Sequence, residues 1–407
     1  EDLKKIRQTR KEDSEAGKEL LKKEIQTSNE LKAWWIDEMK TTEFPLREKM
    51  TLFWENHFVT AYQKVKVNYW IFQKNQLLRE NAFGNFKTLT KKAMQTNAMV
   101  RYLDNVDNKK GKLNENLSRE LLELFTLGIG NYSEADIKNG AKGLAGLGVG
   151  ETTAMYRRFL EDNDPIEYLG KKGVLKLDEM VDAIFDHPKI PYLLTQKILQ
   201  WFLYDEPKEN LVKHYGDYFR KVNFEIKPLL IKIFTEEFAK NDTAGSKIKN
   251  PLEYILLLTS ELKTQRPEST TIAFFLKQQG MDLFNPPNVK GWDGGKSWLT
   301  SQIYLQRNNV ADLLSSGKSI PRSKLERENT LNKKQAFSIS LDWNTKGTNK
   351  EIIKELTDRL LFSTDTSLQQ DLEKILKYDF DPQSLGANDA VLRLFNAIIK
   401  SPEFQLI

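Results

Sequence analysis

The chain has 407 residues, enough for one large domain or for two to three ordinary ones. Its 62 basic and 57 acidic residues leave a formal net charge of +5 without a long lysine and arginine block, so nucleic acid is not an expected partner. The absence of cysteine excludes disulfides, thiol catalysis and thiolate metal ligands. No stretch approaches the ~18 consecutive apolar residues of a membrane-spanning helix, so an integral membrane protein is not expected.

Residues 1–40 form a charged amphipathic segment with two adjacent tryptophans near its end. Because the chain starts with EDLKK rather than with methionine, we expect that a segment was removed before residue 1. A first helical block is predicted at 41–147 from the helical spacing of its apolar residues. Its helices are expected at 46–60, 62–80, 85–103, 115–127 and 133–146, and Ser133 followed by Asp136 resembles a capping box.

The helical periodicity breaks at residues 148–177, where glycine, aspartate and proline predict a long loop. A second helical block follows at 178–313 and contains FNPPNVKGWDGGKSW, which must be irregular because it holds two prolines and three glycines. A loop-rich segment at 314–350 and helices at 351–407 complete the chain. The prediction is a single mainly α, large and irregular helical domain with long Gly/Pro-rich loops.

The stretch NENLSRELLELFTLG, residues 114–128, is predicted to place leucines on one helix face and polar side chains on the other. The simplest interpretation is a solvated face on which Arg119 pairs with Glu115 or Glu123. Asn114 and Asn116 favour a specific site over a merely solvated face, because asparagine is a poor helix former that serves caps and specific hydrogen bonds. Glu120 and Glu123 are candidate catalytic carboxylates, and a helix hairpin would bring Glu134 and Asp136 close to them.

Two other features are candidates for chemistry. His57 lies among aromatic residues, where a core histidine bonded through one nitrogen is the commoner role, although a catalytic role stays open. Trp292 and Trp298 lie on the Gly/Pro-rich loop, which suits either a platform for sugar rings or a loop fixed by buried indoles. The chain has no HExxH, GxSxG, P-loop or dinucleotide motif, so no metal site and no cofactor is expected.

At these residues the sequence resembles the bacterial family known as domain of unknown function 1800. The matching segments are MTLFWENHF (50–58), YLDNVDNKKGKLNENLSRELLELFTLGIGNYSEADIKNGAKGLAGL (102–147), DHPKIPYLLTQKILQWF (186–202), PPNVKGWDGGKSW (286–298) and SPEF (401–404). The resemblance covers most of the chain from about residue 40. It implies a largely helical, exported bacterial protein without an established reaction, and it favours a site at the polar cluster, because the cluster residues and His57 match the family pattern.

Three departures from the family pattern stand out. Glu55 replaces a histidine, Leu147 replaces a tryptophan, and Glu161 with Asp162 stands where the family tends to carry His-Asp. If those histidines bind a metal or move protons in the family, this member uses carboxylates in their place or has lost the activity.

We expect an uncharacterised cell-envelope protein, periplasmic, secreted or on the cell surface, that binds a glycan or similar polar polymer and hydrolyses it if it is an enzyme. In this hypothesis Glu120, Glu123 and His57 are catalytic, and the other candidates bind the ligand, namely Asn114, Asn116, Arg119, Glu134, Asp136, Trp292 and Trp298. A non-catalytic assembly or scaffold protein with a buried polar network, with another envelope protein as partner, is the first alternative. A carboxylate-rich metal enzyme is the second.

Overall fold

The computed structural model describes residues 15–238, 240, 245–264, 269–316 and 339–407. The chain divides into two compact units, and neither is continuous in sequence. Unit 2 comprises Thr41–Asn241 and Phe284–Trp292, and unit 1 comprises Glu1–Lys40, Asp242–Leu283 and Asp293–Ile407. These limits differ from the predicted blocks, because the Gly/Pro-rich loop is shared between the units. That the chain folds as a single domain stays a prediction.

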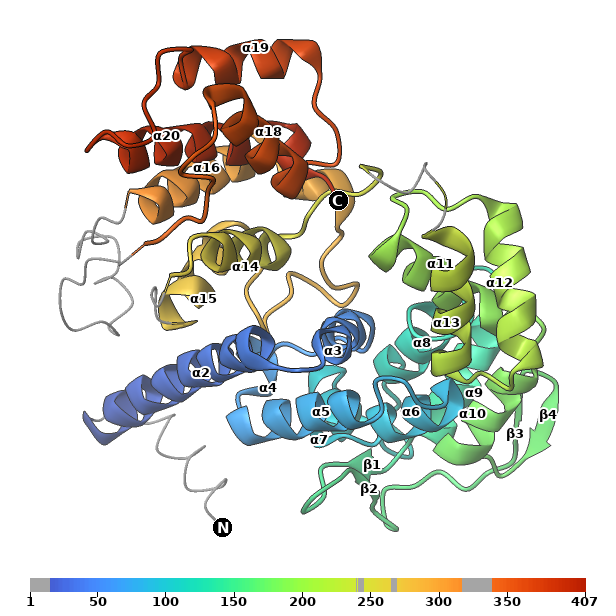
Figure 1. Cartoon of the computed structure of the whole chain (residues 1–407). Helices are drawn as coiled ribbons and strands as arrows, with labels where there is room; N and C mark the ends of the chain where they lie inside the picture. Colours follow the sequence, from blue (N-terminus) through green and yellow to red (C-terminus); the bar gives the residue numbers. More distant parts are fainter. Residues whose placement is uncertain (1–14, 239, 241–244, 265–268, 317–338) are drawn as a thin grey trace. The chain divides into compact units, whose positions relative to one another are not determined.

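Unit 2 is built from helices and two short hairpins (Figure 1). Its helices are α3 (Pro45–His57), α4 (Tyr62–Val65), α5 (Asn68–Glu80), α6 (Phe86–Met94), α7 (Asn97–Tyr102), α8 (Asn116–Glu123), α9 (Glu134–Gly143), α10 (Leu177–Asp186), α11 (Ile190–Phe202), α12 (Glu209–Lys221) and α13 (Ile226–Glu237), with the 3₁₀ helix η1 (Asn105–Asp107). The predicted helix at 62–80 is divided at Lys66, which adopts a left-handed conformation with φ 57°. Asn85, Thr96 and Ser133 cap the helices that follow them through side-chain hydrogen bonds.

The predicted loop at 148–177 contains two antiparallel hairpins. Strands β1 (Leu147–Gly148) and β2 (Met155–Tyr156) form the first, with Leu147 opposite Tyr156. Strands β3 (Ile166–Tyr168) and β4 (Lys171–Gly173) form the second. These strands are too short for a sequence periodicity to show, and the predicted mainly α class is confirmed.

An aromatic core fixes the centre of unit 2. The ring of Trp54 stacks on those of Phe58 and Phe86, and further rings come from Phe125, just after α8, and from Phe185 of α10. Helices α11, α12 and α13 run side by side in the same unit (Figure 1). Such large buried rings dominate the hydrophobic stabilisation of a core, so they hold α3, α6 and α8 in one arrangement.

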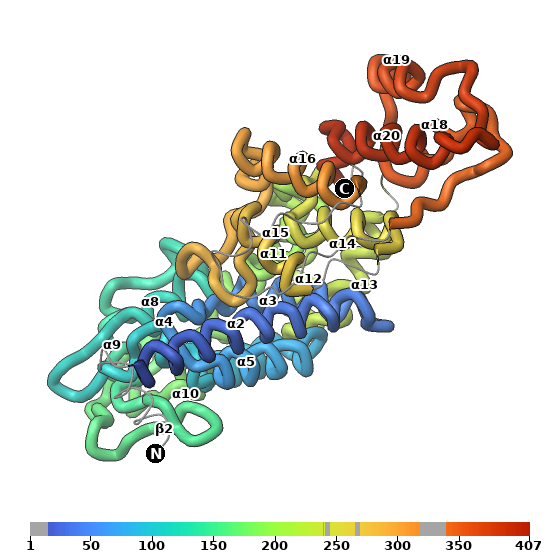
Figure 2. The backbone as a smooth tube through the Cα atoms, turned by 90° about the vertical axis from the view of Figure 1, so that its left-hand side faces the viewer, coloured from blue at the N-terminus to red at the C-terminus, as the bar shows by residue number. Residues whose placement is uncertain are grey.

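Unit 1 is also helical. It contains α2 (Glu15–Thr41), α14 (Pro251–Glu261), α15 (Ser269–Gln278), η2 (Gly295–Leu299), α16 (Ser301–Ser315), α18 (Asn349–Leu360), α19 (Thr366–Ile375), α20 (Ala387–Ile399) and η4 (Glu403–Gln405). Helices α16, α18 and α19 each contact α20 (Figure 2). Helices α18, α19 and α20 lie in the range where the C-terminal helices were predicted. Of the predicted loop-rich segment 314–350, residues 317–338 lie outside the described residues, as do residues 1–14 of the N-terminal segment.

Candidate functional site

The polar cluster predicted from the sequence is the solvent-facing side of α8 and the turn before it. Leu117, Leu121 and Leu122 are buried and anchor the helix on unit 2. Asn116 is exposed, whereas Glu115, Arg119, Glu120 and Glu123 are half-buried. The cluster is therefore neither fully solvated nor sealed in the core.

Arg119 joins α8 to α9. Its guanidinium donates two hydrogen bonds to the carboxylate of Glu134, each 3.0 Å long, and one of 3.3 Å to Glu115. The hydrogen bond to Glu134 raises the pKa of Arg119, and the same bond lowers the pKa of Glu134. The Glu115 partner follows from the helical spacing. The stronger partner, Glu134, lies on the next helix, and such bidentate pairs hold a geometry well even where solvent weakens them.

Glu123 also has a partner from beyond its own helix. The hydroxyl of Tyr132 donates to Glu123 Oε2 at 2.7 Å. Burial, followed by this hydrogen bond and the charge of Glu123, raises the pKa of Tyr132 to about 12. Tyr132 was not among the predicted site residues. Its position in the turn between α8 and α9 was a possible signal, because a helix hairpin returns that turn to the end of α8.

Glu120 differs from its neighbours. Its carboxylate makes no hydrogen bond or ion pair with any residue that the structure describes, although its main-chain carbonyl accepts from the amides of Leu124 and Phe125. Burial and then the charge of Glu123 raise its pKa, while Arg119 and Lys290 act in the opposite direction. Glu120 in turn contributes to the raised pKa of Tyr102. A half-buried carboxylate with a raised pKa, charged neighbours and no protein partner is a functional-site candidate on physical grounds.

Glu134 and Asp136 begin α9 but act differently. Asp136 Oδ2 accepts from the amide of Ser133 at 2.8 Å and from its hydroxyl at 2.6 Å, which completes the predicted capping box. Asp136 Oδ1 accepts from the amide of Leu169 at 2.8 Å. Burial opposes ionisation of Asp136, but the hydrogen bonds from Ser133 and Leu169 outweigh it and lower the pKa. Glu134 therefore reaches the cluster through Arg119, whereas both oxygens of Asp136 are used by the backbone around it.

The asparagines build the turn before α8. Asn114 Oδ1 accepts from the amide of Asn116 at 3.0 Å, and Asn116 Nδ2 donates to Asp104 at 3.4 Å. Behind them, Asn108 Oδ1 accepts from the amide of Asn114, while its Nδ2 donates to Asn105 and to the carbonyl of Ala141. Asn105 and Asn108 are buried and lie in the family-like stretch, and the sequence analysis did not assign them a role. They fix the approach of the chain to α8.

His57 is a core residue. Its Nε2 lies 3.0 Å from the carbonyl oxygen of Phe125, which only accepts hydrogen bonds, so Nε2 carries the proton. Its Nδ1 faces Lys197 Nζ at 3.4 Å, and Lys197 also donates to the carbonyl of Leu124 at 2.9 Å. Burial and then the charge of Lys197 lower the pKa of His57 well below its usual value. Burial lowers the pKa of Lys197 to about 8. The pair thus satisfies carbonyl groups at the end of α8.

Residues 284–292, the first part of the Gly/Pro-rich loop, lie beside α3 and α4 within unit 2. Asn56 accepts from the amide of Trp292 at 2.7 Å and donates to its carbonyl, and Asn285 accepts from the amide of Gln63 at 3.0 Å. The same loop carries Lys290, whose charge acts on Glu120. Lys290 therefore lies close enough to α8 to act on its carboxylate.

The two loop tryptophans lie in different units, and both are buried. Trp292 belongs to unit 2 and Trp298 to unit 1, and the exposed fractions of the two residues are 7% and 6%. Such burial leaves little indole face for a sugar ring, so we assign neither of them ring stacking. The indole N–H of Trp292 is buried and has no acceptor among the described residues.

Comparison with protein families matches residues 1–406 to the family described as "Protein of unknown function (DUF1800)". The chain belongs to this family. Comparisons with curated proteins and with solved structures find no match.

The carboxylates that depart from the DUF1800 pattern are paired with lysines. Glu55 Oε2 accepts from Lys74 Nζ at 2.5 Å, and both side chains are buried. Glu161 lies 3.1 Å from Lys176. Asp162 accepts from the amide of Asp164 and is half of a weaker pair with Lys110. A carboxylate neutralised by a lysine is poorly suited to replace a histidine as a metal ligand or proton carrier.

Across the described part of the chain, no three histidine, aspartate or glutamate side chains gather in a group that could hold a metal ion. The hypothesis of a carboxylate-rich metal enzyme therefore has no support in the geometry of this DUF1800 member. In the same described part, every helix is too short or too polar to span a bilayer.

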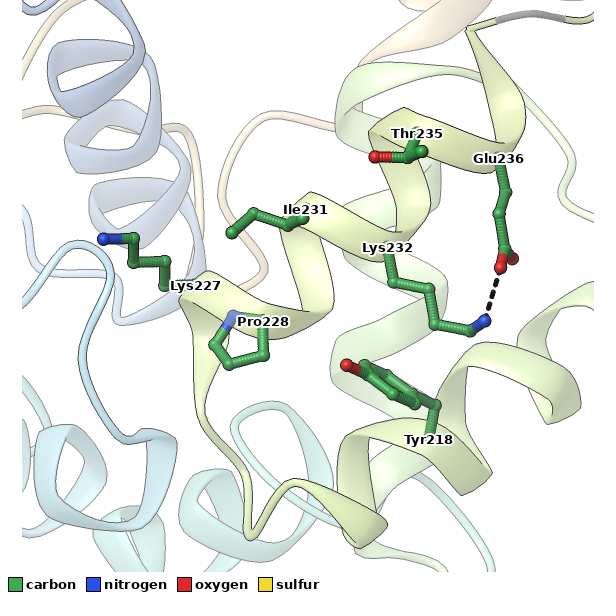
Figure 3. A pocket seen from close by; sticks show the side chains of 7 residues that line it. All are labelled: Tyr218, Lys227, Pro228, Ile231, Lys232, Thr235 and Glu236. Atoms are coloured by element: carbon green, nitrogen blue, oxygen red, sulfur yellow. Dashed lines mark hydrogen bonds and ion pairs between the residues drawn. The ribbon is translucent and has the colours of Figure 1, made fainter.

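A surface hollow of about 560 Å³ lies between α12 and α13, away from the predicted residues (Figure 3). Tyr218, Pro228 and Ile231 supply its apolar lining, and an ion pair between Lys232 and Glu236 closes one side. The ammonium of Lys232 lies 5.1 Å from the centre of the Tyr218 ring. The ring face is thus already occupied by a protein cation, and no unpaired carboxylate marks this hollow as a reaction centre.

Proposed function

We propose that this DUF1800 member binds a hydroxyl-rich polar polymer, such as a glycan of the bacterial cell envelope, at the solvent-facing side of α8. The proposal includes export to the cell envelope, which the family resemblance implies. One observation carries it: Glu120 is a half-buried carboxylate with a raised pKa and no hydrogen bond or ion pair among the described residues. Its neighbours in the cluster are satisfied by one another.

The chemistry of the surroundings supports a ligand rich in hydroxyl groups. An unpaired carboxylate accepts hydrogen bonds from sugar hydroxyls, and bonds to a charged group contribute roughly 1.5–3 kcal/mol each. Lys290 and Arg119 act on Glu120 and supply donors for ligand oxygens. Arg119 stays oriented by Glu134 while its remaining surface faces solvent.

Hydrolysis is the further part of this proposal. A carboxyl group whose pKa is raised suits a general acid, and Glu123 on the same face is the second carboxylate. Glu123 is oriented by Tyr132. Because Glu120 and Glu123 lie three residues apart on one helix, they also suit a shared binding task, which makes binding the primary claim.

The test is a glycan-array screen of the purified chain together with metal analysis, repeated with Glu120→Gln. We expect the variant to fold as the parent does and to lose binding by about ten-fold or more, because glutamine keeps the shape but not the charge. Glu209→Gln, an exposed carboxylate in the first turn of α12, is the matched control and should bind as the parent does. Equal binding by Glu120→Gln and the parent would refute the assignment.

A scaffold role is the second candidate, and the buried asparagine network favours it. Asn105 donates to the carbonyls of Leu144 and Leu147, and Asn108 links Asn105 to the turn before α8. Such a satisfied network rigidifies a fold whether or not a ligand binds. If the parent binds nothing on the array and Glu120→Gln unfolds, the cluster is structural and the scaffold role stands.

A further inference from the structure

Two neighbouring loops of unit 2 expose large apolar side chains. The first is the turn at 109–113. The second comprises residues 155–160 and begins with strand β2. Phe159 is 97% exposed, Met155 is 57% exposed and Leu113 is 40% exposed. We call these two loops the basic–apolar patch. Single exposed apolar residues are common, but three on adjoining loops form a surface that water solvates poorly.

Main-chain hydrogen bonds hold the two loops together. The amide of Lys110 donates to the carbonyl of Leu160 at 2.9 Å, and the amide of Arg157 donates to the carbonyl of Gly146 at 2.9 Å. Gly146 donates in turn to the carbonyl of Asn108, which also belongs to the buried asparagine network. The β1–β2 hairpin supports the second loop (Figure 1). Phe159 is therefore presented by a backbone that is tied to the unit.

The patch is also rich in exposed cations. Lys109, Lys112, Arg157 and Arg158 are exposed and form no ion pair with any carboxylate that the structure describes. Arg157 donates to the carbonyl of Val149 at 3.2 Å, which leaves its charge uncompensated.

The acidic groups nearby are fewer or already paired. Lys110 pairs with Asp164 at 3.2 Å and with Asp162 at 3.6 Å, and Glu161 is paired with Lys176. Asp107 and Glu151 are the exposed acids on the adjoining turns. The five cations Lys109, Lys110, Lys112, Arg157 and Arg158 face the four acids Asp107, Glu151, Asp162 and Asp164, so the patch keeps a small excess of positive charge.

We propose that the basic–apolar patch docks unit 2 on an anionic phospholipid bilayer, with Phe159 and Met155 inserted at the level of the headgroups. An interfacial contact of this kind combines apolar insertion with attraction between basic side chains and anionic lipids. Long lysine and arginine side chains reach the headgroups while the aromatic ring enters the apolar boundary. The positive charge of the patch favours an anionic bilayer over a neutral one. The exposed ring of Phe159 favours a bilayer over a soluble polyanion. The proposal does not depend on ligand binding at Glu120.

The test is co-sedimentation of the full chain with vesicles of phosphatidylcholine alone and of phosphatidylcholine with phosphatidylglycerol. We expect binding to the anionic vesicles that weakens as salt is raised, with little binding to the neutral ones. Phe159→Ala should remove most of the binding. Arg157→Gln and Arg158→Gln should each weaken it by about five-fold, because one cation near an anionic surface contributes about that factor.

Tyr378→Ala is the matched control, since Tyr378 is 91% exposed but is followed by the acidic residues Asp379 and Asp381. This variant should bind as the parent does. Circular dichroism should show that all variants stay folded, because the changed side chains are exposed. The proposal is overturned if the parent does not bind anionic vesicles, if it binds both vesicle types equally, or if Phe159→Ala binds as the parent does. Binding that depends on the arginines but not on Phe159 points to a soluble polyanion and overturns it as well.

Discussion

The buried pair of Lys74 and Glu55 offers a direct test of how this chain uses a carboxylate where the family pattern has a histidine. Their side chains are 0% and 5% exposed, and Lys74 Nζ also donates to Thr60 Oγ at 3.0 Å. Burial lowers the pKa of Lys74, while the charge of Glu55 and the hydrogen bond to it act in the opposite direction. Lys74→Met removes the cation and leaves Glu55 buried, with Asn75 Nδ2 at 3.2 Å as its remaining donor. We expect a loss of about 3–5 kcal/mol in the free energy of unfolding, the usual cost of removing one partner from a buried pair.

The double variant Glu55→Leu with Lys74→Met separates the cost of an uncompensated charge from the value of the pair. Replacing both partners with apolar residues is often nearly neutral. Here Asn75 loses its acceptor, so a residual loss of roughly 1–3 kcal/mol is expected. Urea unfolding, monitored by circular dichroism, gives the free energy of unfolding of each variant from its midpoint and a common m-value. Lys213→Met, which breaks an exposed pair with Asp217, is the control and should leave the unfolding midpoint nearly unchanged. A loss below about 1 kcal/mol in Lys74→Met, or a double variant less stable than the single one, would refute the reasoning.

Two further predictions concern His57 and the Gly/Pro-rich loop. His57 has a lowered pKa in the folded protein, whereas the unfolded chain takes up a proton near the ordinary value of 6.5, so stability should fall as the pH drops below about 6.5. Thermal melts between about pH 7.5 and pH 5 should show this loss of stability in the parent and a smaller loss in His57→Gln. If the melting temperature falls equally with pH in the two proteins, the role of His57 as a neutral core residue is contradicted. Gly291 has φ +89°, and a side chain there would collide with Asn56, whose main-chain oxygen is 2.8 Å from the Cβ position. Gly291→Ala should therefore cost about 2 kcal/mol or more in urea unfolding, since overpacking adds to left-handed backbone strain. Gly111→Ala, at φ +77° with open space around it, should cost only the backbone part, and equal losses in the two variants would contradict the docking of the loop on Asn56.

The candidate site was predictable from the sequence where it depends on neighbours along one helix. The leucines of α8 are buried and its polar residues face outward, because a repeat of 3.6 residues sorts them onto two faces. The pairing of Arg119 with Glu115 and the capping box of Ser133 and Asp136 follow from spacings of three or four residues. Tyr132 contacts Glu123 across the expected helix hairpin, so its position was a signal that the sequence contained. The roles of Asn108 and Lys197 were not predictable, since each contacts an element that the local pattern does not identify.

The sequence by itself determined the mainly α class, most helix positions, the irregular Gly/Pro-rich loop and the amphipathic cluster at residues 114–123. Only the tertiary structure decided which charges are matched: it pairs Arg119 with Glu134 and Glu55 with Lys74, and it leaves Glu120 without a partner among the described residues. It also buries Trp292 and Trp298, which the loop sequence allowed to be exposed. The physical reason is range: helix periodicity and capping act within one turn, whereas burial and ion pairing depend on residues brought together from distant parts of the chain.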